Sequence, residues 1–412
     1  MNASIESTPT NPTPTKTAKP PIPRKPLLRR ASIRALIAGT LLAVVLTQPA
    51  AAVTWVGESR LTATANYHPT ILRTGATSAI SIWQHGQNVY ARRTGNGGST
   101  WASTQTLVTG IWFNVSAASS GMNVDLAYVK QVRNADGSTS RRLYYKRSTN
   151  GGATFGSARA MTSTGSNIGD QAIARHSAGQ VSIAWTGLTS GNIYMRTSID
   201  GGATFGAARY VGHSNNSEVG RVVIYRGDLQ LAIGTGVTYI AYSSAHDTLA
   251  VRRTLNRGVS WTSAKVLNTA AGSDYSLVGS GSKAVIGYTT TSSGAMVARM
   301  RRTTDKGTTW SASKPLVGIS TGTFSARPAF SYRSGVLAVV VKYGTPGNSP
   351  VWSRESTDFG TSWSARTRVS LVHFADSDPE PAGIAILGTI RLAGYNENRS
   401  APDEGFWVRR SQ

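Results

Sequence analysis

Carboxylates with the potential for acid–base chemistry recur at one place in successive segments of this sequence. Each lies 14 to 17 residues before an aromatic residue that ends a short apolar strand, or takes the same place before a longer segment. Two carboxylates that face each other can act as general acid and general base on a glycosidic bond. Asp170, Glu218 and Asp274 are the acids that we predict for this chemistry.

The same place in the other segments holds residues suited to binding a ligand. These residues are His68, Asn114, Arg327, Asp378 and the nearby Glu380. One polar residue per segment, at equivalent positions, would form a ring around a common axis. The alternative is that each side chain caps a backbone amide at the start of its strand or binds water. Both interpretations fit the sequence.

Six copies of one short motif indicate what holds this ring. Each reads Ser or Thr, any residue, Asp or Asn, any residue, Gly, any residue, Ser or Thr, and an aromatic residue, and the aromatics recur every 49 to 56 residues. Gly permits a backbone conformation that other residues resist, and Asp or Asn bonds to nearby backbone, so the motif predicts a turn. The positions with structural roles are Asn96, Gly98, Trp101, Asn150, Gly152, Phe155, Asp200, Gly202, Phe205, Asn256, Gly258, Trp261, Asp305, Gly307, Trp310, Asp358, Gly360 and Trp363.

A calcium-binding loop is the alternative interpretation of this motif. Asn replaces Asp in three of the six copies, however, and no second carboxylate follows at the spacing of a calcium loop. We therefore expect a structural turn, with no metal and no cofactor.

Strands with a period of two surround each motif and predict one four-stranded blade per repeat. At the N-terminus, Thr54-Trp55 matches the end of the motif, and Leu61 follows Trp55 at the spacing seen in the other copies. The chain stops at Arg410-Ser411-Gln412, where a seventh motif would begin. The sequence thus predicts an all-β, seven-bladed β-propeller of four-stranded antiparallel blades, in which the N-terminal strand closes the last blade.

The motif resembles the Asp-box, or BNR repeat, of sialidase-like β-propellers, and the resemblance covers residues 53–412. It implies that ligands bind on the loop face opposite the boxes. Active sialidases use three arginines, a Tyr nucleophile activated by Glu, and an Asp acid/base. Here Tyr67-His68-Pro69 stands where an Arg-Ile-Pro-like motif is expected, and sialidases usually have six blades. This departure argues against a true sialidase.

The N-terminal region has the pattern of an exported protein. Residues 1–23 are rich in Pro and Thr and predict a disordered leader. Residues 24–52 predict a signal peptide, with a basic start, an apolar centre and a cleavage site between Ala52 and Val53. No later stretch is long enough for a transmembrane helix, and the chain has no cysteine. We expect residues 53–412 to be secreted without disulfides.

The formal net charge of +24 favours anionic partners. Arginines cluster at strand ends beside the boxes, where they could bind an acidic polymer or simply face solvent. No nucleic-acid-binding module is recognisable. We expect a monomeric protein that binds a glycan or protein ligand on its loop face, with catalysis not established. The alternative is an exo-acting glycoside hydrolase that uses the carboxylates at the channel mouth.

Overall fold

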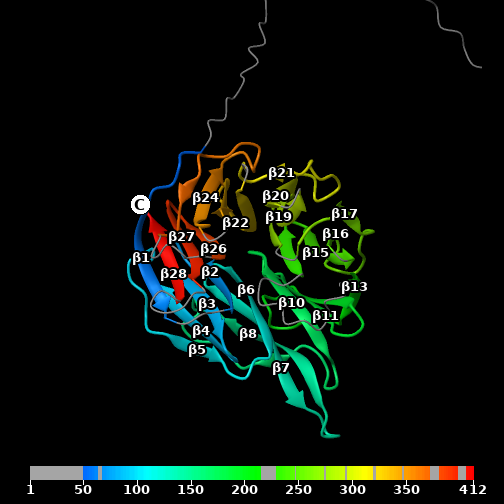
Figure 1. Cartoon of the computed structure of the whole chain (residues 1–412). Coiled ribbons are helices and arrows are strands. Elements are labelled where there is room, and N and C mark those ends of the chain that lie inside the picture. Colours follow the sequence, from blue (N-terminus) through cyan, green and yellow to red (C-terminus); the bar gives the residue numbers. More distant parts are fainter. Residues whose placement is uncertain are drawn as a thin grey trace, which may run out of the picture. The chain divides into compact units, whose positions relative to one another are not determined.

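The computed structural model describes most of the chain after residue 49. The described ranges are 50–63, 67–214, 229–245, 247–272, 275–292, 295–318, 322–345, 348–371, 380–397 and 405–412. The described residues belong to one compact unit. The described residues contain seven four-stranded antiparallel sheets and no helix, which confirms the predicted fold class (Figure 1).

Six blades follow the chain order, each from its innermost to its outermost strand. Blades one to three comprise β2 (Tyr67–Arg73), β3 (Ala79–His85), β4 (Asn88–Thr94) and β5 (Gln105–Val108); β6 (Phe113–Ser120), β7 (Asn123–Arg133), β8 (Thr139–Ser148) and β9 (Arg159–Ala160); and β10 (Ile168–Arg175), β11 (Val181–Gly187), β12 (Asn192–Ser198) and β13 (Arg209–His213). Blades four to six comprise β14 (Gln230–Gly234), β15 (Val237–Ala245), β16 (Thr248–Thr254) and β17 (Lys265–Asn268); β18 (Ser276–Ser280), β19 (Lys283–Ser292), β20 (Ala295–Thr303) and β21 (Lys314–Pro315); and β22 (Phe324–Arg333), β23 (Val336–Gly344), β24 (Val351–Ser356) and β25 (Thr367–Arg368).

The seventh blade joins the two ends of the fold. It comprises β26 (Glu380–Leu387), β27 (Ile390–Glu397), β28 (Gly405–Ser411) and, as the outermost strand, β1 (Trp55–Thr62). Strands β1 and β28 are antiparallel, with Trp55 opposite Ser411 and Arg60 opposite Trp407. The innermost strands contact one another in blade order, and β26 also contacts β2, so the ring is closed. The predicted closure by the N-terminal strand is confirmed.

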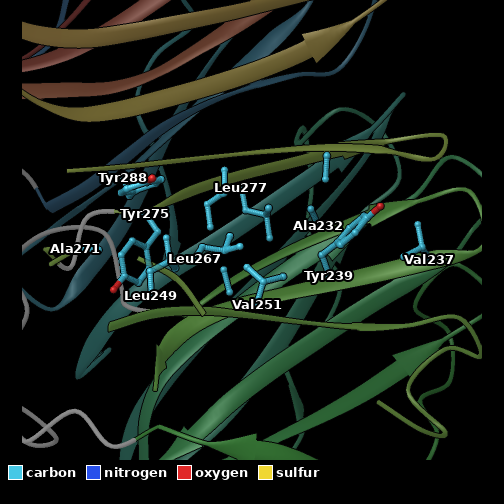
Figure 2. Packing of buried hydrophobic residues seen from close by; sticks show 13 residues of the cluster. Ala232, Val237, Tyr239, Leu249, Val251, Leu267, Ala271, Tyr275, Leu277 and Tyr288 are labelled. Atoms are coloured by element: carbon cyan, nitrogen blue, oxygen red, sulfur yellow. The ribbon is translucent and has the colours of Figure 1, made fainter. Parts of the chain in front are cut away.

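Apolar contacts between neighbouring blades hold the ring together. Seven buried clusters each combine residues of two adjacent blades. Figure 2 shows the cluster in which Tyr239 and Val251 of blade four lie beside Leu277 and Tyr288 of blade five. The six box aromatics each pack against the cluster shared with the preceding blade, and Trp55 does so for blade seven.

The boxes are closed turns whose own side chains satisfy the backbone. In the second box the Ser148 hydroxyl accepts from the Gly152 amide at 2.9 Å, and Asn150 Oδ1 accepts from the Thr154 amide at 2.9 Å. Asn150 Nδ2 donates to the Thr154 hydroxyl, whereas in the third box the Thr204 hydroxyl donates to Asp200. Because a hydroxyl can donate or accept, Asn and Asp close the same turn.

The Asp boxes predict a loss of stability in acid that the Asn boxes avoid. Hydrogen bonds to the carboxylates lower the pKa values of Asp200 and Asp305. The largest contribution comes from the Thr204 hydroxyl at Asp200 and from the Thr309 hydroxyl at Asp305. Burial opposes ionisation of Asp358, but donors from Ser362 and Ser356 still lower its pKa to about 2. A carboxyl whose pKa is lowered by folding stabilises the fold above its unfolded pKa of about 4 and loses that effect as the pH falls through its folded pKa.

We therefore expect the triple variant Asp200→Asn, Asp305→Asn, Asp358→Asn to lose less thermal stability than the wild type between about pH 4 and pH 2. Melting temperatures measured by circular dichroism across this range provide the test. The converse variant, Asn256→Asp, should increase the sensitivity to acid. If the melting temperatures of all three proteins fell in parallel with pH, the box carboxylates would not control the acid sensitivity of the fold.

Candidate functional site

A cavity of about 490 Å³ runs along the axis of the ring. The innermost strands of all seven blades line it. Because these strands follow the same direction around the ring, each end of the cavity collects residues from equivalent ends of the strands. Asp170, near the start of β10, marks one end, and Arg175, the last residue of β10, marks the other. The second end is the box side, since Arg175 donates to the carbonyl of the box residue Gly201.

Bulges near the starts of the innermost strands fall where the sequence predicted a polar ring. The pairing of β10 with β11 shifts register between Ile168 and Gln171, which places Asp170 in the bulge. Corresponding shifts place Arg327 in the bulge of β22, His68 in that of β2 and Asn114 in that of β6. A bulge redirects side chains relative to a regular strand, so four blades carry a polar residue at an equivalent place.

Blade seven departs from this pattern. Its register shift lies between Pro381 and Gly383, so Ala382 takes the bulge position rather than the predicted Asp378. Glu380 pairs with Asn396, two residues before the bulge. The bulge of blade seven lies closer to the strand-ending Tyr395 than the bulges of β2, β6 and β10 lie to their strand-ending aromatics. Asp378, Glu218 and Asp274 lie outside the described residues.

Asp170 binds backbone amides of two neighbouring blades. One carboxylate oxygen accepts from the Gln171 amide at 2.8 Å, and the other accepts from the Leu229 amide at 2.9 Å, just before β14. The Asp170 amide donates to the Thr186 hydroxyl at 2.8 Å. Burial raises the pKa of Asp170 to about 6, although the two amides act in the opposite direction. Asp170 therefore links blades three and four, and its pKa lies well above the usual value for Asp.

Arg327 has a strained backbone. Arg327 lies within β22 and has a φ of 52°, which is a left-handed conformation. Among the described strands, no other non-glycine residue has a positive φ. Its amide donates to the Thr289 hydroxyl of blade five at 3.0 Å, which fixes the bulge against the neighbouring blade. Non-glycine residues in this conformation are uncommon and concentrate at functional sites. The structure thus singles out Arg327 among the predicted ring residues.

The rim arginines beside the boxes are largely bound to the protein itself. Arg302 donates to the carbonyls of Asp358 and Phe359 in the next box at 3.2 and 3.1 Å. Arg354 donates to the carbonyl of Leu316 at 2.8 Å, and Arg409 to that of Val369 at 2.8 Å. These bonds cap turns and outer strands of adjacent blades, which favours the structural interpretation of the rim over an acidic-polymer site.

Comparisons with known proteins establish the fold alone. No family model matches the chain, and no curated protein does. Among solved structures, an ulvan lyase of the polysaccharide lyase PL25 family has a TM-score of 0.57 at 10% identity, covering 86% of this chain and 95% of that chain. The polysaccharide lyase Uly1 has a TM-score of 0.54 at 9% identity, covering 87% and 100%.

Sialidases are also among the similar structures. A Hadza microbial sialidase has a TM-score of 0.48 at 14% identity, covering 74% of this chain and 66% of that chain.

Within the described ranges, no group of three or more His, Cys, Asp and Glu residues could hold a metal ion. No helix in those ranges is long and apolar enough to cross a membrane.

Sequence reasoning missed a buried charge network at the box end of the cavity. Asp125, fully buried on β7, accepts from the Tyr145 hydroxyl at 2.5 Å and from Arg175 at 2.8 Å. Burial raises the pKa of Asp125 to about 6 against the effect of these donors. The sequence does contain one sign of this network, because Asp125 is an acidic residue inside the otherwise apolar run Val124–Tyr128. The network joins blades two and three and neutralises Arg175.

Proposed function

We propose that residues 53–412 form an exported, sialidase-like propeller that binds a carbohydrate at the end of the cavity marked by Asp170, with no catalytic step assigned. The observation that carries this proposal is the set of bulged innermost strands, which carry Asp170 and Arg327 at equivalent places in their blades. Asp170 lines the central cavity. A guanidinium and a carboxylate on one rim can bond to the hydroxyl and acidic groups of a saccharide.

Fold likeness adds an argument by analogy. An ulvan lyase structure bound to -[GlcA(1-4)Rha3S]- has a TM-score of 0.56 and covers 86% of this chain. That ligand contains an acidic sugar and is the kind of polymer that the positive charge of this chain would attract. Anionic polysaccharides are therefore the first ligands to test.

One observation favours a second function, a glycoside hydrolase. The pKa of Asp170, raised to about 6, suits a general acid that must be protonated near neutral pH. Both of its oxygens already accept amide hydrogens, however, which suits a residue that fixes the site. The geometry of the described residues therefore favours binding.

A panel of neutral and acidic polysaccharides, scored for both retention and bond cleavage, separates the two functions. We expect Arg327→Ala to weaken retention of an acidic polysaccharide about tenfold, corresponding to the loss of one charge-assisted contact. Arg257→Ala is the matched control, since Arg257 is an exposed arginine with a φ of 58° in a box on the opposite face. Equal losses in both variants would contradict binding at the loop face.

Cleavage products would shift the conclusion toward the hydrolase. In that case the double variant Asp170→Asn, Glu218→Gln should abolish cleavage. Its melting temperature, measured in parallel, shows whether the variant is still folded. Cleavage that survives in the folded double variant would remove these two acids from the reaction. Retention without cleavage by the wild type would support the binding function.

A further inference from the structure

The box end of the cavity carries positive charge that the protein does not neutralise. Arg73 is the last residue of β2 and Arg333 the last residue of β22, and both line the cavity. Their strands flank the innermost strand of blade seven, since β26 contacts both β2 and β22. Two half-buried guanidinium groups therefore face the same end of one cavity from either side of a single blade.

Neither arginine has a carboxylate partner among the described residues, where the salt bridges are Arg175 with Asp125 and Arg391 with Glu355. Arg73 Nε is buried without a hydrogen-bond partner. The two groups are close enough for the charge of Arg333 to add to burial in lowering the pKa of Arg73. Like charges brought together in a partly buried place repel each other, and an anion between them would remove that cost.

The turns that end the innermost strands offer no carboxylate to the pair. The innermost strands end in turns at 73–78, 119–123, 175–180, 233–237, 279–283, 333–336 and 386–390, all of which the structure describes, and no acidic residue occurs in them. Asp125 already bonds to Arg175 and Tyr145. Lys283 adds a further positive charge at this end, above the ring of Phe359.

The backbone of the pair is well supported. The Ser119 hydroxyl of blade two donates to the Arg73 carbonyl at 2.8 Å. Tyr332, next to Arg333, packs edge-on against Phe359 with ring centroids 5.1 Å apart. Ser120 and Ser331 also line the cavity and could offer hydroxyl donors to a ligand. Carried on this supported backbone, the two guanidinium groups provide a pair of donors for oxygen atoms.

We propose that Arg73 and Arg333 form a site for a tetrahedral oxyanion, sulfate or phosphate, at the box end of the central cavity. Guanidinium groups bind the oxygens of such anions with directed hydrogen bonds, and two of them match a double negative charge. The site lies at the opposite end of the cavity from Asp170 and does not depend on carbohydrate binding there.

Calorimetric titration of the folded protein with sodium sulfate and with inorganic phosphate, at ionic strength held constant with sodium chloride, tests the proposal. We expect saturable binding of one anion per chain by the wild type. Arg73→Gln and Arg333→Gln should each weaken binding at least tenfold, and the double variant should show none. Arg257→Gln, which removes an exposed arginine from a box, should bind as the wild type does. No saturable heat with the wild type would overturn the proposal.

Thermal melts provide a second measurement that a merely structural role would not explain. Without sulfate or phosphate, Arg333→Gln should melt at or above the wild-type temperature, because the substitution relieves repulsion of Arg73. Sulfate should raise the melting temperature of the wild type more than that of the double variant. The rise in the double variant measures the general stabilisation that sulfate gives to folded proteins. Equal gains, or a marked loss of stability in Arg333→Gln without an anion, would contradict the site.

Discussion

Replacing Trp55 and Leu61 together by alanine is expected to unfold much of the protein at room temperature. Loss of a buried Trp costs about 3–5 kcal/mol and loss of a buried Leu about 2–5 kcal/mol. Trp55 is 7% exposed in the cluster between blades six and seven, and Leu61 is 3% exposed in the cluster between blades seven and one. Because they pack in separate clusters, we expect the two costs to add.

The reason for so large an effect is that β1 closes the ring. Trp55 Nε1 also donates to the Ser353 hydroxyl of blade six at 2.8 Å, so its removal leaves a buried hydroxyl with one partner fewer. Domains of this kind have a net stability of about 5–15 kcal/mol, which the double substitution approaches. Urea denaturation followed by tryptophan fluorescence and circular dichroism measures the change.

Val266→Ala is the control for this experiment. Val266 lies on the outermost strand of blade four and is 51% exposed, so its truncation should change stability by less than about 0.5 kcal/mol. If Trp55→Ala, Leu61→Ala proved no more destabilising than the control, closure by the N-terminal strand would not hold the ring.

The closure could be predicted from sequence because it depends on local chemistry that repeats. Each box has its own Gly and its own Asp or Asn, and the aromatic residue after it must pack against the previous blade. An unmatched aromatic at Trp55 and an unmatched Ser411 therefore had to belong together. Counting back from the strand aromatic also located Asp170 and Arg327, which lie in the bulges.

Counting along the sequence does not give the position of the bulge in blade seven, because pairing between strands decides where a bulge forms. Ala382 occupies the bulge there, closer to Tyr395 than the spacing in other blades implies. The arginines that end innermost strands, Arg73 and Arg333, were missed for a related reason. Only the ring brings together residues 260 positions apart in the chain, and nothing in the local sequence distinguishes them from the rim arginines.

Buried charge pairs between blades were likewise invisible in the sequence. Glu355, on β24 of blade six, accepts hydrogen bonds from Nε and Nη2 of Arg391, on β27 of blade seven. Glu355 is 5% and Arg391 9% exposed. Glu355 stands directly before the box Ser356, at the end of a strand on which Val351, Ser353 and Ser356 are buried as well. Its partner could be identified only from the packing of blade on blade.

Glu355→Gln is expected to lower the free energy of unfolding by about 3–5 kcal/mol, because it leaves the Arg391 guanidinium buried without a counter-charge. The double variant Glu355→Gln, Arg391→Met removes the stranded charge and should recover most of the loss. Equilibrium denaturation of the wild type, both single variants and the double variant gives the coupling energy between the two residues. A double variant no more stable than Glu355→Gln would show that Arg391 is held by other groups, such as the Gly388 carbonyl to which it also donates.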